Sequence, residues 1–125
     1  MSFTTTDCWV LFSIGFSKRG STLKNIIRTG DYLNRAILTR EELETSLNKL
    51  LHNNYIDVSE DRFFVTDKAL AFYSQYKKTS EGCIIEWLRL SEILKHQPAK
   101  PDEIHIINLT KEEYKKALNE YKTGL

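Results

Sequence analysis

Apolar residues recur at intervals of three or four along six stretches of the chain, and this spacing predicts amphipathic helices. The stretches cover about residues 6–17, 22–34, 40–53, 66–78, 83–96 and 110–125. Gly30 and Asp31 are placed to interrupt the second helix, because glycine weakens a helix interior. The pattern therefore predicts a mainly helical protein.

Three helix starts are marked by local chemistry. Thr39 is followed three positions later by Glu42, and Thr110 by Glu113, so each pair can form a capping box. Thr66 is a third candidate cap. Apolar residues just before each threonine can pack on the first turn as a hydrophobic staple. These signals fix where three helices begin.

Two short apolar runs between the third and fourth helices predict a β-hairpin. Residues 55–58 and 62–65 flank the polar loop 59–61, which is the usual sequence arrangement of a short hairpin. Residues 103–109 are also short and apolar, which indicates a strand or an extended docking segment. The predicted fold class is mainly α with a small β-hairpin.

The order of these elements between residues 6 and 76 carries a resemblance. Leu38 to Asp57, followed by Arg62-Phe-Phe-Val-Thr-Asp67, resembles the winged helix-turn-helix superfamily of bacterial transcriptional regulators. The resemblance implies a winged helix-turn-helix core over residues 1–78 and a C-terminal helical extension over 79–125. It also implies a small DNA-binding regulator whose third helix enters the major groove while the hairpin lies along the backbone.

Residues 40–53 would then be the recognition helix. Rotating 100° per residue from the leucine stripe turns five side chains outward, namely Glu41, Thr45, Asn48, Lys49 and His52. Arg62 is the cation of the predicted hairpin. The candidate contacts to double-stranded DNA are Arg35, Arg40, Thr45, Asn48, Lys49 and Arg62.

The distribution of charge favours an alternative. The net charge of +1 is the sum of +4 over residues 1–40, −4 over 41–76 and +1 over 77–125. The acidic segment coincides with the predicted reading elements, and carboxylates there repel phosphates. A winged-helix protein–protein interaction module that does not bind DNA is therefore the second hypothesis. Phe64, which strand alternation turns outward, is a candidate partner contact.

The predicted helix over residues 83–96 is apolar on more than one side. Cys83, Trp87, Leu90 and Leu94 share one face, whereas Ile85, Leu88 and Ile93 point elsewhere. Such a helix is normally buried on more than one side. It forms a homodimer interface, or residues 104–125 fold back and cover it, or both. The candidate dimer or partner contacts are Phe64, Ile85, Leu88 and Ile93.

Several classes of site lack a sequence signal. No nucleotide-binding, nucleophile-elbow or metalloprotease motif is present, and the three histidines do not cluster, so we expect no enzyme, cofactor or metal site. Residues 1–6 lack the pattern of a signal peptide, and no stretch has membrane-spanning length. Cys8 and Cys83 are far apart and are expected to be reduced core thiols in a cytoplasmic protein.

Overall fold

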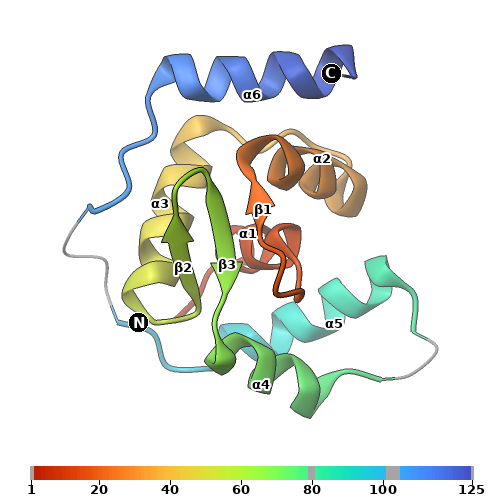
Figure 1. Cartoon of the computed structure of the whole chain (residues 1–125). Helices are drawn as coiled ribbons and strands as arrows, with labels where there is room; N and C mark the ends of the chain where they lie inside the picture. Colours follow the sequence, from red (N-terminus) through yellow and green to blue (C-terminus); the bar gives the residue numbers. More distant parts are fainter. Residues whose placement is uncertain (1, 79–80, 101–104, 125) are drawn as a thin grey trace.

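The computed structural model describes residues 2–78, 81–100 and 105–124. The fold is mainly helical with a small antiparallel sheet, as the sequence predicts (Figure 1). In chain order the elements are α1 (Thr5–Ile14), β1 (Ser21–Thr22), α2 (Leu23–Asn34), α3 (Arg40–His52), β2 (Ile56–Ser59), β3 (Arg62–Val65), α4 (Asp67–Tyr76), α5 (Cys83–Lys95) and α6 (Lys111–Thr123).

The predicted helix starts are confirmed. Thr39 and Thr110 form complete capping boxes with Glu42 and Glu113, and the Thr66 hydroxyl accepts the hydrogen bond of a first-turn amide. A further capping box, formed by Thr4 at the start of α1, was not anticipated. Helix α1 ends three residues earlier than expected, because Gly15 terminates it with φ of 85°.

The sheet has three strands rather than two, in the order β1-β3-β2. Strands β2 and β3 form the predicted hairpin, with Ile56 paired to Val65 and Ser59 paired to Arg62. Its turn is two residues long instead of three, and Glu60 adopts a positive φ of 56° to close it. The sequence does not predict strand β1, because a strand of two residues is too short to show a period-two pattern.

Helix α2 runs unbroken through Gly30, where α1 approaches closely. A β-carbon at Gly30 would lie 2.9 Å from the Leu38 side chain. The Trp9 indole donates a hydrogen bond of 2.9 Å to the Gly30 carbonyl. The glycine therefore admits a neighbouring helix and does not interrupt its own.

Helix α1 lies at the centre of the molecule. Every residue from Asp7 to Ile14 is buried, and the helix contacts α2, α3 and α5. Such all-round burial is expected for a helix that is apolar on every side. The core is thus built around the first helix, with α2, α3 and α5 arranged on its faces.

The C-terminal segment does not cover α5. Figure 1 shows α6 lying along α2, on the opposite side of the molecule from α4 and α5. Residues 105–110 run as an extended segment past α3 and belong to no strand. The alternative in which residues 104–125 fold back over α5 is therefore wrong for the described residues 105–124.

Candidate interaction surfaces

Part of the outer face of α3, predicted to read DNA, is covered by the chain's own residues 105–110, here called the strap. Asn48 is 1% exposed. Its amide nitrogen donates to the Ile107 carbonyl at 2.8 Å, and its amide oxygen accepts from the Ile106 and Ile107 N–H groups at 3.0 and 2.8 Å. The prediction of an outward Asn48 available to DNA is wrong, because a segment 59 residues away occupies this face.

Two further α3 side chains bind the main chain of the strap at Leu109. The Glu44 carboxylate accepts from the Leu109 N–H at 2.7 Å, and the Arg40 guanidinium donates to the Leu109 carbonyl at 3.1 Å. Arg40 also pairs with Glu41 at 3.0 Å. Arg40 is therefore already engaged within the protein and is not a free phosphate contact.

Lys49 is also withdrawn from solvent. Its ammonium lies 2.8 Å from the Asp7 carboxylate and donates to the Ser2 carbonyl at 2.8 Å, and its side chain is 10% exposed. Asp7 accepts a further hydrogen bond of 2.8 Å from the Ser46 hydroxyl. Because α1 passes beneath this part of α3, the prediction of an outward Lys49 is wrong.

The other three candidate DNA contacts are exposed. Arg35 follows the end of α2, and Arg62 lies on β3, where its guanidinium approaches the Gly20 carbonyl at 3.4 Å. Thr45 lies in a depression of about 350 Å³ that is also lined by Glu41 and Glu42. Carboxylates beside Thr45 oppose the approach of a phosphate backbone.

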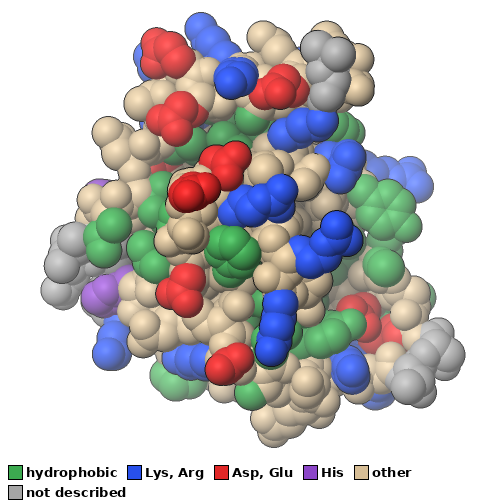
Figure 2. Space-filling model, viewed as in Figure 1, with side chains coloured by type: hydrophobic (Ala, Val, Ile, Leu, Met, Phe, Trp, Pro, Cys, Tyr) green, Lys and Arg blue, Asp and Glu red, His purple; other side chains and the backbone are tan. Residues whose placement is uncertain are grey.

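The basic side chains gather beside the sheet rather than on α3. Figure 2 shows Lys and Arg side chains in a diagonal band over the face that carries β1 and β3, with carboxylates beside it. Lys18 and Arg19, in the loop before β1, and Arg62 are exposed. The positive charge of the first third of the chain is therefore displayed apart from the covered α3 face.

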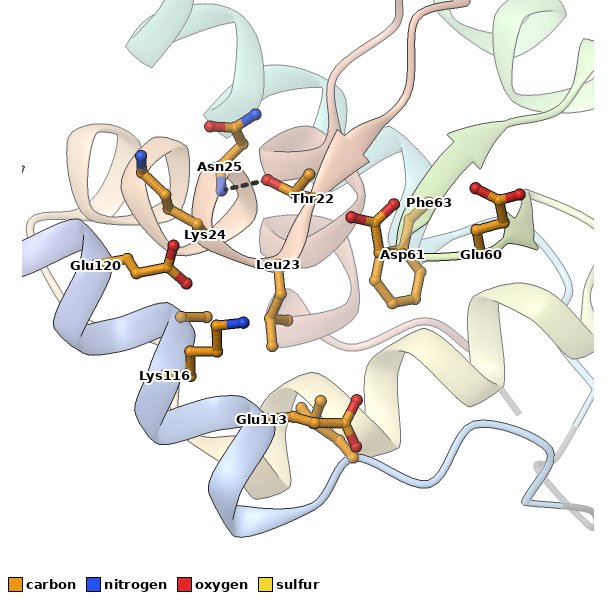
Figure 3. Close-up of a pocket in the computed structure, with 12 residues that line it drawn as sticks. Thr22, Leu23, Lys24, Asn25, Glu60, Asp61, Phe63, Glu113, Lys116 and Glu120 are labelled. Atoms are coloured by element: carbon orange, nitrogen blue, oxygen red, sulfur yellow. Dashed lines mark hydrogen bonds between the residues drawn. The ribbon is translucent and has the colours of Figure 1, made fainter. Parts of the chain in front are cut away.

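A pocket of about 520 Å³ lies between α6, the start of α2 and the hairpin turn (Figure 3). Glu113 and Glu120 project into it from α6, and Glu60 and Asp61 approach from the hairpin turn. Leu109 and Phe63 are among its apolar lining residues. The charged lining residues are Lys24, Glu60, Asp61, Glu113, Lys116 and Glu120.

Phe64 packs within the protein and is only partly exposed. A β-carbon at Gly20 would lie 2.5 Å from the Phe64 ring, and Gly20 has a φ of 76°. Glycine at position 20 therefore allows the loop before β1 to lie against the ring. Phe64 is thus covered in part by the loop before β1, and its role as a partner contact stays a prediction.

The outer face of α5 is apolar and exposed. Ile85 is 62% exposed, Leu88 53% and Ile84 39%, whereas Trp87, Leu90 and Leu94 are buried as predicted. Ile93 is half-buried against the core and does not belong to this face. The Trp87 indole donates to the Leu33 carbonyl at 3.2 Å, which places α5 beside the end of α2 where Tyr32 is 64% exposed. We call Ile84, Ile85 and Leu88 the α5 face.

Charged residues around the α5 face are paired within the chain. Arg89 donates to both Glu81 carboxylate oxygens at 2.9 to 3.1 Å, and Lys95 pairs with Glu92 at 2.7 Å. The hydrogen bonds from Arg89 hold the pKa of the Glu81 carboxyl below its usual range. The α5 face is therefore bordered by neutralised pairs.

Both cysteines are free thiols, but their surroundings differ. Cys8 is buried, and burial together with the nearby Asp7 charge raises the pKa of its thiol to about 12. The prediction of a buried core position is correct for Cys8 and wrong for Cys83, which is exposed at the start of α5. The Cys8 thiol is consequently unreactive as a nucleophile near neutral pH.

Within the described ranges, no three His, Cys, Asp or Glu side chains are grouped closely enough to hold a metal ion. No described helix combines the length and the apolar character needed to cross a membrane. Comparison of the chain with protein-family models, with curated proteins and with solved structures found no match.

Proposed function

We propose that this chain is a winged-helix protein-interaction module that binds a partner helix on the α5 face. The winged-helix assignment is supported by the element order helix, strand, helix, helix and hairpin, with all three strands in one antiparallel sheet. The interaction role is carried by the exposed Ile85 and Leu88 on a helix whose opposite side is buried in the core.

The chemistry of the α5 face indicates its partner. Contiguous exposed apolar side chains on a monomer commonly mark interaction sites. Because the neighbouring charges of Arg89 and Lys95 are already paired within the chain, recognition depends on apolar burial and not on net charge. An amphipathic helix presenting apolar residues every three or four positions fits such a surface.

The size of the α5 face favours a helix over a second copy of the chain. A stable homodimer buries about 800 Å² on each partner, contributed by 20 to 30 residues. The α5 face has three large apolar side chains on one helix, which suits one short partner helix. The homodimer predicted from the sequence is retained as an outcome of the experiment.

Reading of DNA by α3 receives less support than the interaction role. Asn48 and Lys49 have their polar groups bound within the protein, and Thr45 lies beside Glu41 and Glu42. A recognition helix needs free side chains on the face that enters the groove. With the strap in place, α3 does not offer them.

The test is a fluorescence-polarisation titration with a neutral helical peptide of roughly three turns that carries leucines at helical spacing. We expect the wild-type chain to bind it about 10-fold or more tightly than the Ile85→Glu/Leu88→Glu variant, since buried apolar anchors dominate such interfaces. A peptide of the same composition in scrambled order is the control for nonspecific adhesion. Lys115→Glu, an exposed α6 position, is the matched surface variant and is expected to bind like wild type.

Two results would overturn the proposal. Equal peptide binding by wild type and the double variant would show that the α5 face is not the docking site. A wild-type dimer in light scattering that the double variant abolishes would assign the face to a second copy. In parallel, salt-sensitive binding of a random duplex at about 50 mM salt would restore the DNA-binding hypothesis.

A further inference from the structure

The C-terminal arm, defined as residues 105–124, packs on the outside of α2 and α3. Helix α1 is buried by α2, α3 and α5, none of which belongs to the arm. The arm adds the buried Leu109 and Ala117 to the core. Four further apolar side chains of the arm pack partly buried against it, namely Ile107, Tyr114, Leu118 and Tyr121. The arm is therefore held by apolar burial as well as by hydrogen bonds.

The surface under the arm recognises an extended main chain. Arg40, Glu44 and Asn48 lie at successive i, i+4 positions of α3, and all three bond to backbone groups of the strap. Asn48 both donates and accepts, as a neighbouring strand would. Such contacts require extended geometry and a free backbone, and they do not depend on which side chains the strap carries.

Two tyrosines attach α6 to the same surface. The Tyr114 hydroxyl donates to the Leu38 carbonyl at 2.6 Å, and the Tyr121 hydroxyl donates to Asp31 at 2.6 Å. Leu109 supplies the buried apolar anchor between the strap and α6, since it is 4% exposed. The arm therefore docks as one ligand, with an extended part on α3 and a helical part on α2.

Charged side chains of both signs lie across the seam between the arm and the hairpin. Glu113 and Glu120 of α6 line the same pocket as Glu60 and Asp61 of the hairpin turn (Figure 3). Lys116 of α6 and Lys24 of α2 line this pocket as well.

We propose that the surface formed by α2 and α3 is a docking site for the arm of a second copy of this chain, so that two copies can exchange arms. Every contact made by the arm within one chain can form equally well between two chains. Exchange of an identical element is a low-cost route to a dimer. Nine residues, 96–104, separate α5 from the arm, and Lys100 among them is held on α3 by two hydrogen bonds between its backbone and Asn53. This inference does not depend on the α5 face.

Docking within one chain competes with exchange. A tethered segment experiences an effective concentration of roughly millimolar, so the arm of the wild-type chain stays on its own core at micromolar protein. Exchange can be detected when neither chain can dock its own arm. One chain must then have an intact docking surface, and the other chain an intact arm. This condition defines the experiment.

Two variants meet it. Leu109→Asp disables the arm and leaves the docking surface intact, whereas Asn48→Leu disables the surface and leaves the arm intact. We expect each variant alone to be monomeric at about 100 µM by light scattering, and a mixture to form a one-to-one heterodimer, because inequivalent defects complement each other in exchanged dimers. A mixture that stays monomeric overturns the proposal.

The control mixture combines Leu109→Asp with the Leu109→Asp/Asn48→Leu chain, which has neither a working arm nor a working surface. Association through the α5 face would appear in this control as well, whereas arm exchange would not. Far-ultraviolet circular dichroism verifies that each variant is folded before mixing.

A second measurement uses a labelled synthetic peptide of residues 105–124. We expect it to bind Leu109→Asp about 10-fold or more tightly than wild type, whose own arm competes for the site at high effective concentration. Binding should be lost in the Leu109→Asp/Asn48→Leu chain. Equal binding to all three chains would contradict a specific docking surface even if a variant were partly unfolded.

Discussion

The outer faces of α3 and α5 differ in their exposure to solvent. The part of the polar α3 face that bonds to the strap is covered, with Asn48 at 1% exposure, while the apolar face of α5 remains open, with Ile85 at 62%. The strap has no strand partner, so its main-chain groups need hydrogen bonds from elsewhere. Side chains of α3 provide them. Polarity alone therefore does not determine exposure, because a polar face can be buried by a segment that needs its donors and acceptors.

The largest expected change in the free energy of unfolding comes from removal of the Lys49 ammonium. Lys49→Ala leaves Asp7, which is 3% exposed, as a buried carboxylate without its counter-ion. Loss of one partner from a buried pair costs 3 to 5 kcal/mol, and we expect a loss of about 3 kcal/mol because Ser46 and Thr4 still donate to Asp7. The measurement is the free energy of unfolding in urea.

Lys115→Ala is the matched control, since it removes an exposed lysine from α6. Its free energy of unfolding should change by less than about 0.5 kcal/mol. If Lys49→Ala behaves like this control, the Lys49 side chain is accessible in solution and the face is available to a partner after all.

A smaller effect is expected from Asn48→Ala. The substitution removes the hydrogen bonds to Ile106 and Ile107 and should destabilise docking of the arm by about 1 to 3 kcal/mol. Hydrogen exchange should then accelerate in residues 105–124 while the amides of α1 keep their protection, because α1 is enclosed by α2, α3 and α5. Uniform loss of protection across α1 and α6 would show that arm and core unfold as one unit.

The smallest expected effect lies on the α5 face. Leu88→Ala should change the free energy of unfolding by less than about 0.5 kcal/mol, because the side chain is 53% exposed. Leu90→Ala, two positions away on the buried side, is the matched comparison and should cost about 2 to 5 kcal/mol. A similar cost at both positions would mean that Leu88 is already buried in a homodimer.

Features set by neighbouring residues could be predicted from the sequence. The capping threonines of α3, α4 and α6 bond to amides three residues away, so the motif and the structure occupy the same short stretch. The β2–β3 hairpin is equally local. Helical spacing places Ile85 and Leu88 outside the buried apolar stripe of α5, although the sequence leaves open what covers them.

The candidate DNA contacts depended on distant segments and were less predictable. Helical geometry turned Asn48 and Lys49 away from the leucine stripe, but it held no information about what lies outside the helix. The polar series Arg40, Glu44 and Asn48 at i, i+4 spacing was the available signal that this face binds something. It does not distinguish a nucleic acid from the chain's own backbone.

The sequence by itself determined where most helices start, that residues 55–65 form a hairpin and which side of α5 is buried, because these depend on hydrogen bonds and periodicity within a few residues. The tertiary structure decided which polar face is accessible. Asn48 meets Ile107 across 59 residues and Arg40 meets Leu109 across 69. Such pairings follow from the packing of α6 on α2, which brings the strap across α3, and no local pattern encodes that placement.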